Sequence, residues 1–193
     1  MTPNQATAIS ALLSGTGIAL IALAPRHPVV GVAVALCLAL GYVMDSVDGQ
    51  LARLRGTGSR SGEWLDHTVD CFKTSTLHLA VLVSWYRDPV GDEVTLLLPI
   101  VFVVVATAWY FELILLPTLR SPERKPSTGS EHPLRKWALL PVDYGTVCLA
   151  FLLLGWDRVF LVVYALLLLA AVGVLIQALG KWWRELRLLD AAQ

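Results

Sequence analysis

The sequence has few charged residues. Asp, Glu, Lys and Arg together make up 16% of the 193 residues, whereas 56% are hydrophobic. Soluble domains usually contain about 25% charged residues, so this composition argues against an ordinary soluble fold. The 15 basic residues are balanced by 15 acidic ones, and nothing in the sequence supports nucleic-acid binding.

Cysteines are also scarce. The three that occur, Cys37, Cys71 and Cys148, stand at unrelated spacings within apolar segments. We interpret them as small apolar core residues and not as a disulfide framework or a metal site. The sequence also lacks a Ser/His/Asp or Cys/His nucleophile set, which argues against hydrolysis through a covalent intermediate on such a group.

Long apolar runs are abundant. A transmembrane helix needs roughly 20 predominantly apolar residues, and six segments meet this requirement, at residues 6–24, 29–52, 62–86, 94–116, 137–155 and 159–179. The first 20 residues contain no Lys or Arg. A secretory signal begins with such charges, so we predict that the first segment is a retained helix. The sequence therefore predicts an all-α, polytopic membrane protein with six transmembrane helices and a single integral-membrane domain over residues 1–193.

The basic residues are distributed unevenly between the two sides of this predicted bundle. One side carries Arg53, Arg55, Arg60, Arg120, Arg124, Lys125, Arg135, Lys136, Lys181, Arg184 and Arg187. The other side carries Arg26, Arg87 and Arg158. Cytoplasmic connections carry the excess of Lys and Arg, so both termini are expected in the cytoplasm.

Two polar helical stripes flank the connection between the second and third segments. Each carries two aspartates and small residues at spacings of three or four, which places them on one face of a helix. The stripes consist of Asp45, Asp48, Gly49 and Ala52 in the second segment and Gly62, Asp66 and Asp70 in the third. Helices joined by so short a connection are expected to be antiparallel neighbours, so the four carboxylates are predicted to converge on the cytoplasmic side.

Four ionised carboxylates close together in a membrane protein need nearby positive charge to offset their repulsion. A single Asp at the centre of a transmembrane helix costs about 2.5 to 3.5 kcal/mol, and repulsion between several adds to this cost. Lys73 and Arg53 could approach, but two monovalent side chains cannot neutralise the cluster. We therefore predict a two-metal site for Mg²⁺ or Mn²⁺, an arrangement common in phosphoryl transfer. The competing interpretation, in which the aspartates only cap helices and pair with loop arginines, does not explain the glycines beside them.

The spacing of these residues also resembles a known signature. The chain is similar to the CDP-alcohol phosphotransferase (also called CDP-alcohol phosphatidyltransferase) family at Asp45-x2-Asp48-Gly49-x2-Ala52-Arg53-x8-Gly62-x3-Asp66-x3-Asp70. The resemblance implies a membrane enzyme of phospholipid biosynthesis, in which an alcohol hydroxyl attacks the β-phosphorus of a CDP-linked donor and CMP is released. Members of this family are typically homodimers, so a homodimer is expected.

The resemblance further implies individual roles. Asp45, Asp48 and Asp66 would hold the metal pair, and Asp70 would be the general base and could also contact a metal. Gly49, Ala52 and Gly62 would leave room for the CDP group, and Arg53 would hold its diphosphate.

The sequence leaves the acceptor open. The run Gly62-Glu63-Trp64-Leu65-Asp66-His67 is similar to the variant found in choline- and ethanolaminephosphotransferases, whose acceptor is diacylglycerol. Other members combine CDP-diacylglycerol with a phosphorylated polyol, and Lys73, Arg124 and Lys125 could bind such a phosphate. Lys73 is equally well explained as a local countercharge to Asp66 or Asp70.

Several other polar residues are weaker candidates. Glu63 and His67 lie within one turn of the motif aspartates and could support the metals or the acceptor. His78, Glu112 and Asp143 are ionisable groups in apolar segments, where such groups are often functional.

Two other function classes share part of the pattern. Membrane prenyltransferases of the Asp-rich type bind Mg²⁺-diphosphate through aspartates, but they need a second Asp-rich motif, and none follows Asp70. A divalent-cation transporter would distribute its carboxylates along a path and not at one end. We therefore expect a CDP-alcohol phosphotransferase in the bacterial plasma membrane, with its site facing the cytoplasm.

Overall fold

The structure is a computed structural model that describes residues 1–56, 58–120 and 143–191. Within these ranges all regular elements are helices, and no strand occurs. The elements are α1 (Pro3–Leu23), α2 (Pro28–Arg55), α3 (Arg60–Arg87), η1 (Glu93–Leu96), α4 (Leu97–Leu119), α6 (Tyr144–Ala150), η3 (Phe151–Leu153) and α7 (Asp157–Asp190). The prediction of an all-α fold is confirmed for the part of the chain that the structure describes.

Local capping signals set the ends of the helices that carry the motif. Thr2 and Gln5 form a reciprocal capping box at the start of α1. Helix α2 ends at Gly56, whose φ of 62° is the left-handed conformation that glycine adopts without strain. The Ser59 hydroxyl then accepts a hydrogen bond of 3.1 Å from the Gly62 amide and starts α3. The connection between the two motif helices is therefore short and defined at both ends.

Four helical stretches are long and apolar enough to cross a membrane. They are Pro3–Leu23, Pro28–Arg55, Glu93–Leu119 and Asp157–Asp190. Helix α3 is not among them although it has 28 residues, because its first half contains the polar part of the motif. The predicted segment 137–155 is described only from residue 143, as the short apolar helix Tyr144–Leu153. The structure thus supports an integral membrane protein, while the count of six spans stays a prediction.

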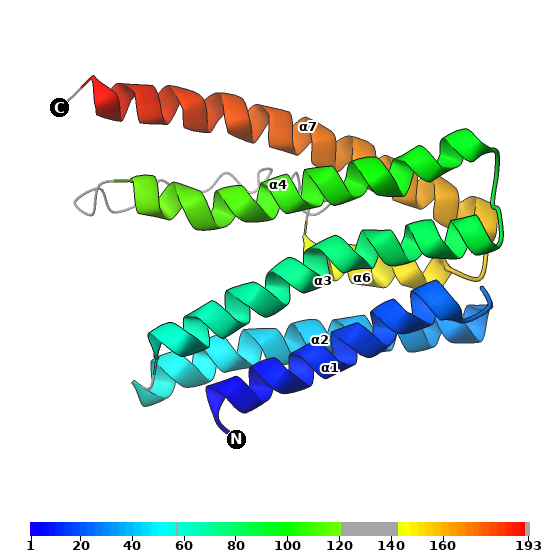
Figure 1. Cartoon of the computed structure of the whole chain (residues 1–193), viewed down its shortest axis with the longest axis horizontal. Helices are drawn as coiled ribbons and strands as arrows, with labels where there is room; N and C mark the ends of the chain where they lie inside the picture. Colours follow the sequence, from blue (N-terminus) through cyan, green and yellow to red (C-terminus); the bar gives the residue numbers. More distant parts are fainter. Residues whose placement is uncertain (57, 121–142, 192–193) are drawn as a thin grey trace.

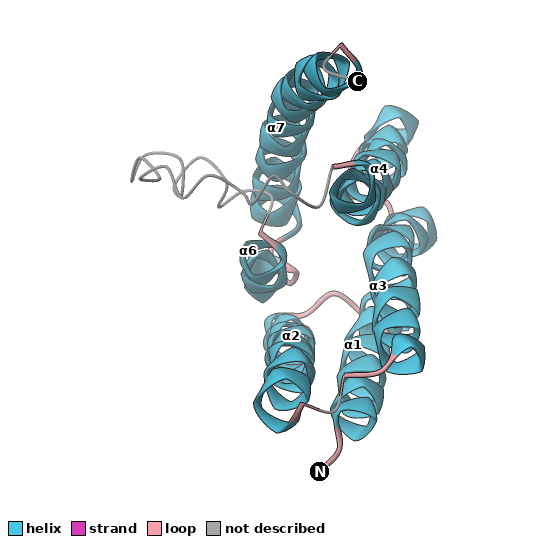
Figure 2. Cartoon of the chain, turned by 90° about the vertical axis from the view of Figure 1, so that its left-hand side faces the viewer, coloured by secondary structure: helices cyan, strands magenta, loops and turns pink. Residues whose placement is uncertain are grey.

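The first three helices form one group, and α4 and α7 form another (Figures 1 and 2). Helix α1 packs against both α2 and α3, α4 packs against α3 and α7, and α6 with η3 lies between α2 and α7. Helices α2 and α3 run antiparallel as predicted, but they diverge and have few direct contacts, so the expectation that they pack as neighbours is wrong.

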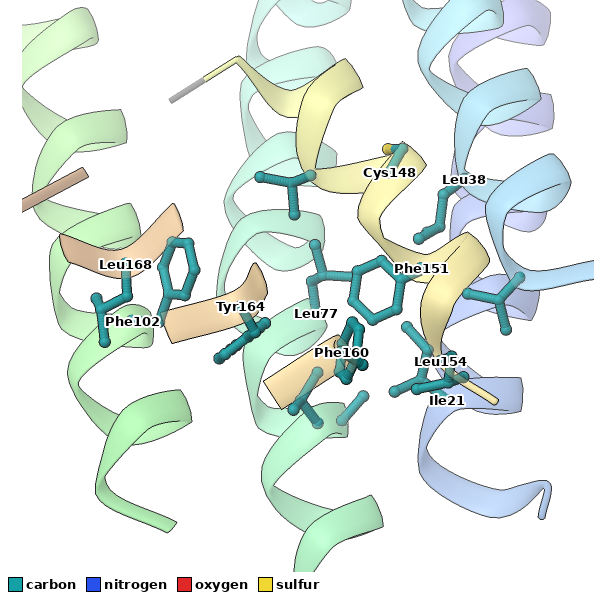
Figure 3. Close-up of a cluster of buried hydrophobic side chains, with 14 of the residues drawn as sticks. Ile21, Leu38, Leu77, Phe102, Cys148, Phe151, Leu154, Phe160, Tyr164 and Leu168 are labelled. Carbon is teal, nitrogen blue, oxygen red and sulfur yellow. The ribbon is translucent and has the colours of Figure 1, made fainter. Parts of the chain in front are cut away.

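The hydrophobic core takes buried side chains from α1, α2, α3, α4, α6 and α7 (Figure 3). The His78 ring stacks on Phe102 with 3.9 Å between centroids, and its Nδ1 lies 2.8 Å from the Tyr164 hydroxyl. This candidate therefore has structural partners in the core. Among the cysteines, Cys148 is buried as predicted, but Cys71 is exposed, so the core interpretation is wrong for that residue.

Candidate active site

Helix α1 supplies hydroxyl groups that hold the first two motif aspartates. The Thr7 hydroxyl donates a hydrogen bond of 2.6 Å to Asp48 Oδ2, and both residues are buried. The Ser10 hydroxyl lies 2.8 Å from the Gly41 carbonyl oxygen and 3.3 Å from Asp45 Oδ1. The motif alone does not predict these contacts, because they depend on how α1 packs on α2.

Lys73 links the second and third motif helices. Its ammonium group forms ion pairs with Asp45 and with Asp70, the latter at 2.6 Å, and it lies 3.3 Å from the Ser10 hydroxyl. The lysine side chain is only 9% exposed, so it is a buried counterion. The geometry agrees with the countercharge interpretation, with Asp45 and Asp70 as partners and not Asp66.

The four aspartates converge as the sequence predicts. One oxygen from each of Asp45, Asp48 and Asp66 lies within 4.8 Å of the other two. Ligand atoms of Asp66, His67 and Asp70 form a second group of the same size. Asp66 belongs to both groups, and oxygen-rich sites of this kind suit Mg²⁺ and Mn²⁺. The residues present therefore fit a pair of divalent cations.

A cavity of about 380 Å³ opens between α1, the α2–α3 connection and the two motif helices. We call it the motif cavity; its walls include Asp48, Gly49, Ala52, Gly62 and Asp66. A side chain at Gly49 would have no atom nearer than 3.8 Å to its Cβ, so packing within the chain does not require glycine there. The missing side chain instead leaves the cavity open.

Two other motif residues, Gly62 and Arg53, have surroundings that differ from those of Gly49. A Cβ at Gly62 would lie 3.1 Å from both Asn4 Oδ1 and Ser59 Oγ, so this glycine permits a close approach of α1 and the α3 cap. The Arg53 side chain is exposed and does not line the motif cavity, whereas Arg60 does. Sequence reasoning treated Arg60 only as part of a basic connection, so its position beside the motif was missed.

A second, larger cavity of about 610 Å³ lies between α2, α3, α4, α6 and α7. We call it the core cavity; its charged lining residues include Asp45, Asp70, Asp143 and Lys73, and side chains of α4 form much of its wall. The four aspartates are thus divided, with Asp48 and Asp66 facing the motif cavity and Asp45 and Asp70 facing the core cavity. A ligand in one cavity and a ligand in the other would meet at the carboxylates.

The remaining candidates have varied positions. Glu63 lines the motif cavity, and the His67 carbonyl accepts a 2.5 Å hydrogen bond from the Tyr110 hydroxyl of α4. Asp143 caps α6 through the Thr146 amide and lines the core cavity. Glu112 is half-buried on α4. Arg124, Lys125, Arg135 and Lys136 lie outside the described residues.

Comparison with protein families decides the classification. The family model for CDP-alcohol phosphatidyltransferases matches residues 1–183. This chain belongs to the CDP-alcohol phosphatidyltransferase family. The match confirms the family predicted from the motif, and with it the transfer of a substituted phosphate group from a CDP-linked donor to an alcohol in phospholipid biosynthesis. It supports neither the prenyltransferase nor the transporter alternative.

Solved structures of a related enzyme have the same fold as this chain. Mycobacterium tuberculosis phosphatidylinositol phosphate synthase (PgsA1) with CDP-DAG bound is 21% identical, with a TM-score of 0.62 over 95% of this chain and 87% of that one. The same enzyme in complex with manganese and citrate is 21% identical, with a TM-score of 0.64 over 95% and 83% of the two chains. A comparison with curated proteins finds no match.

Proposed function

We propose that the protein binds a CDP-linked donor in the motif cavity and transfers the substituted phosphate to an alcohol positioned at Asp70. The observation that carries this proposal is the division of the carboxylates between two cavities that meet at the acidic cluster. The donor side has the open space at Gly49 and Ala52 and a basic side chain, Arg60. The acceptor side has a carboxylate that can take a proton.

Asp70 is proposed to act as the general base. Its carboxylate accepts the proton of the acceptor hydroxyl while the oxygen forms a bond to the β-phosphorus and the bond from that phosphorus to the CMP oxygen breaks. Lys73, 2.6 Å from Asp70 Oδ1, holds this carboxylate at the edge of the core cavity. Arg60, which lines the motif cavity, or Arg53, whose guanidinium lies 3.8 Å from the Cβ position of Gly49, would contact the diphosphate.

Asp45, Asp48, Asp66 and Asp70 are proposed to hold Mg²⁺ or Mn²⁺ ions. When bound, these ions would neutralise charge on the donor diphosphate and on the departing CMP. The proposal is supported by the shared position of Asp66 in two ligand groups, and by manganese in the related phosphatidylinositol phosphate synthase. Thr7 would keep Asp48 oriented, because it donates a buried hydrogen bond to that carboxylate.

We further propose a single integral-membrane domain with six spans, a homodimer, and a site on the cytoplasmic side of a bacterial plasma membrane. The start of α1, the end of α7 and the α2–α3 turn lie at the same end of the bundle, the end that carries the acidic cluster (Figure 1). The excess of basic residues in the connections at that end supports a cytoplasmic location. The homodimer rests on the family resemblance.

The proposal is tested by measuring CMP release from purified protein in nanodiscs, with and without Mg²⁺ or Mn²⁺. CDP-diacylglycerol, CDP-choline and CDP-ethanolamine are each offered with a pool of alcohols. We expect metal-dependent release that Asp70→Asn abolishes and that Asp190→Asn, a matched change at an exposed position on α7, leaves intact. Absence of release from all donors, together with absence of metal-dependent CDP binding, would contradict the proposed function.

A further inference from the structure

We propose that the core cavity binds the acceptor, and that this acceptor is an uncharged alcohol carried on an apolar chain. The inference rests on the proposed function, because it takes Asp70 as the group that deprotonates the hydroxyl. It goes further in naming the acceptor class, which the sequence left open between a lipid alcohol and a phosphorylated polyol.

The wall of the core cavity is a continuous apolar stripe on α4. Phe102, Val105, Ala106, Trp109 and Leu113 all line it, at the spacing of three and four that defines one helical face. From residue 102 to residue 113 this stripe extends about 16 Å along the helix axis, at about 1.5 Å per residue. A compact polyol phosphate would leave most of that length unused, whereas an alkyl chain would cover it.

Neighbouring helices continue the apolar surface. Leu77 of α3 and Ala171 of α7 line the same cavity. Figure 3 shows Leu77 of α3, Phe102 of α4 and Tyr164 of α7 within the same cluster of buried side chains. The cavity volume of about 610 Å³ is within the range of about 300 to 1,000 Å³ that is usual for small-molecule sites. It accommodates the alcohol end of a lipid and part of its chain.

The described charged residues that line the core cavity offer no unpaired lysine or arginine to an anionic acceptor. Among the described residues that line it, Asp45, Asp70 and Asp143 are acidic and Lys73 is the basic residue. Lys73 is already paired with Asp45 and Asp70, so it offers no unpaired cation to a phosphate group. A phosphate on the acceptor would therefore find no unpaired lysine or arginine among the described residues of this cavity, whereas a hydroxyl on an apolar chain needs none.

Asp70 lies where the charged part and the apolar part of the core cavity meet. Its carboxylate lines the core cavity at the polar end, where the apolar stripe of α4 meets the acidic cluster. An alcohol with its chain along α4 and its hydroxyl at Asp70 would approach the acidic cluster from the core cavity. Asp48 and Asp66 line that other cavity, where the donor is placed.

The test uses the full-length protein in nanodiscs and diacylglycerol with a photoreactive group on its acyl chain. After illumination, mass spectrometry locates the labelled residues. We expect labelling of cavity-facing residues of α4 that excess unlabelled diacylglycerol suppresses and that glycerol 3-phosphate does not. Ala106→Phe, which fills the cavity, should reduce this labelling about tenfold. Val104→Phe, a matched change at a position 64% exposed on the same helix, should leave it unchanged.

Labelling confined to outward-facing residues, or unaffected by Ala106→Phe, would overturn the inference. CMP release measured on the same samples separates it from the proposed function. Release with a phosphorylated polyol but not with diacylglycerol would refute the acceptor class and leave the proposed function standing. Cavity labelling without metal-dependent binding of any CDP-linked donor would refute the proposed function and leave the lipid site standing.

Discussion

Replacing Lys73 with methionine should destabilise the metal-free protein and increase its dependence on divalent ions. The ammonium group is buried and paired with Asp45 and Asp70, and removing one partner of a buried pair costs about 3 to 5 kcal/mol. The two carboxylates are 22% and 26% exposed, so we expect the lower end of this range, about 3 kcal/mol. For a chain of this size that corresponds to a decrease of about 6 to 12 °C in Tm.

The assay is thermal unfolding of the purified protein in detergent, first with EDTA and then with Mg²⁺ or Mn²⁺. Divalent ions should raise the Tm of Lys73→Met more than that of the unmodified protein, because they restore the missing positive charge beside Asp45 and Asp70. Lys181→Met, at an exposed position on α7, is the matched control and should change little. Equal Tm values for Lys73→Met and the unmodified protein in EDTA would refute the countercharge argument.

Three further substitutions test individual site residues. Asp70→Asn should lower turnover by about 10²- to 10⁴-fold and preserve metal-dependent CDP binding measured by equilibrium dialysis, and undiminished turnover would exclude Asp70 as the base. Thr7→Val removes a buried hydrogen bond to Asp48 and should cost about 1.5 to 3 kcal/mol in unfolding free energy, with weaker metal binding in titration calorimetry; an unchanged metal affinity would show that Asp48 does not need this support. Gly49→Leu should fold normally, because Cβ has no neighbour within 3.8 Å, yet raise the KM for the donor; an unchanged KM would place the donor outside the motif cavity.

The acidic cluster was predictable because it depends on spacing along the chain. Asp45 and Asp48 share a helical face, as do Asp66 and Asp70, and the short connection from Gly56 to Ser59 brings the two faces together. The predicted convergence of the carboxylates therefore agrees with the structure, although direct packing of α2 on α3 was wrong. Helix propensity and caps act locally, whereas the choice of neighbours depends on the whole bundle.

The sequence by itself determined the helical membrane fold and the acidic motif, because these depend on composition, on apolar run length and on fixed spacings within 26 residues. The reaction class followed from the resemblance of that motif to the family signature. Only the tertiary structure decided that Thr7 and Ser10 hold the aspartates, that Lys73 bridges Asp45 and Asp70, and that two separate cavities meet at the cluster. These features join helices that are distant in sequence, and side-chain packing between such helices leaves no periodic signal in any one of them.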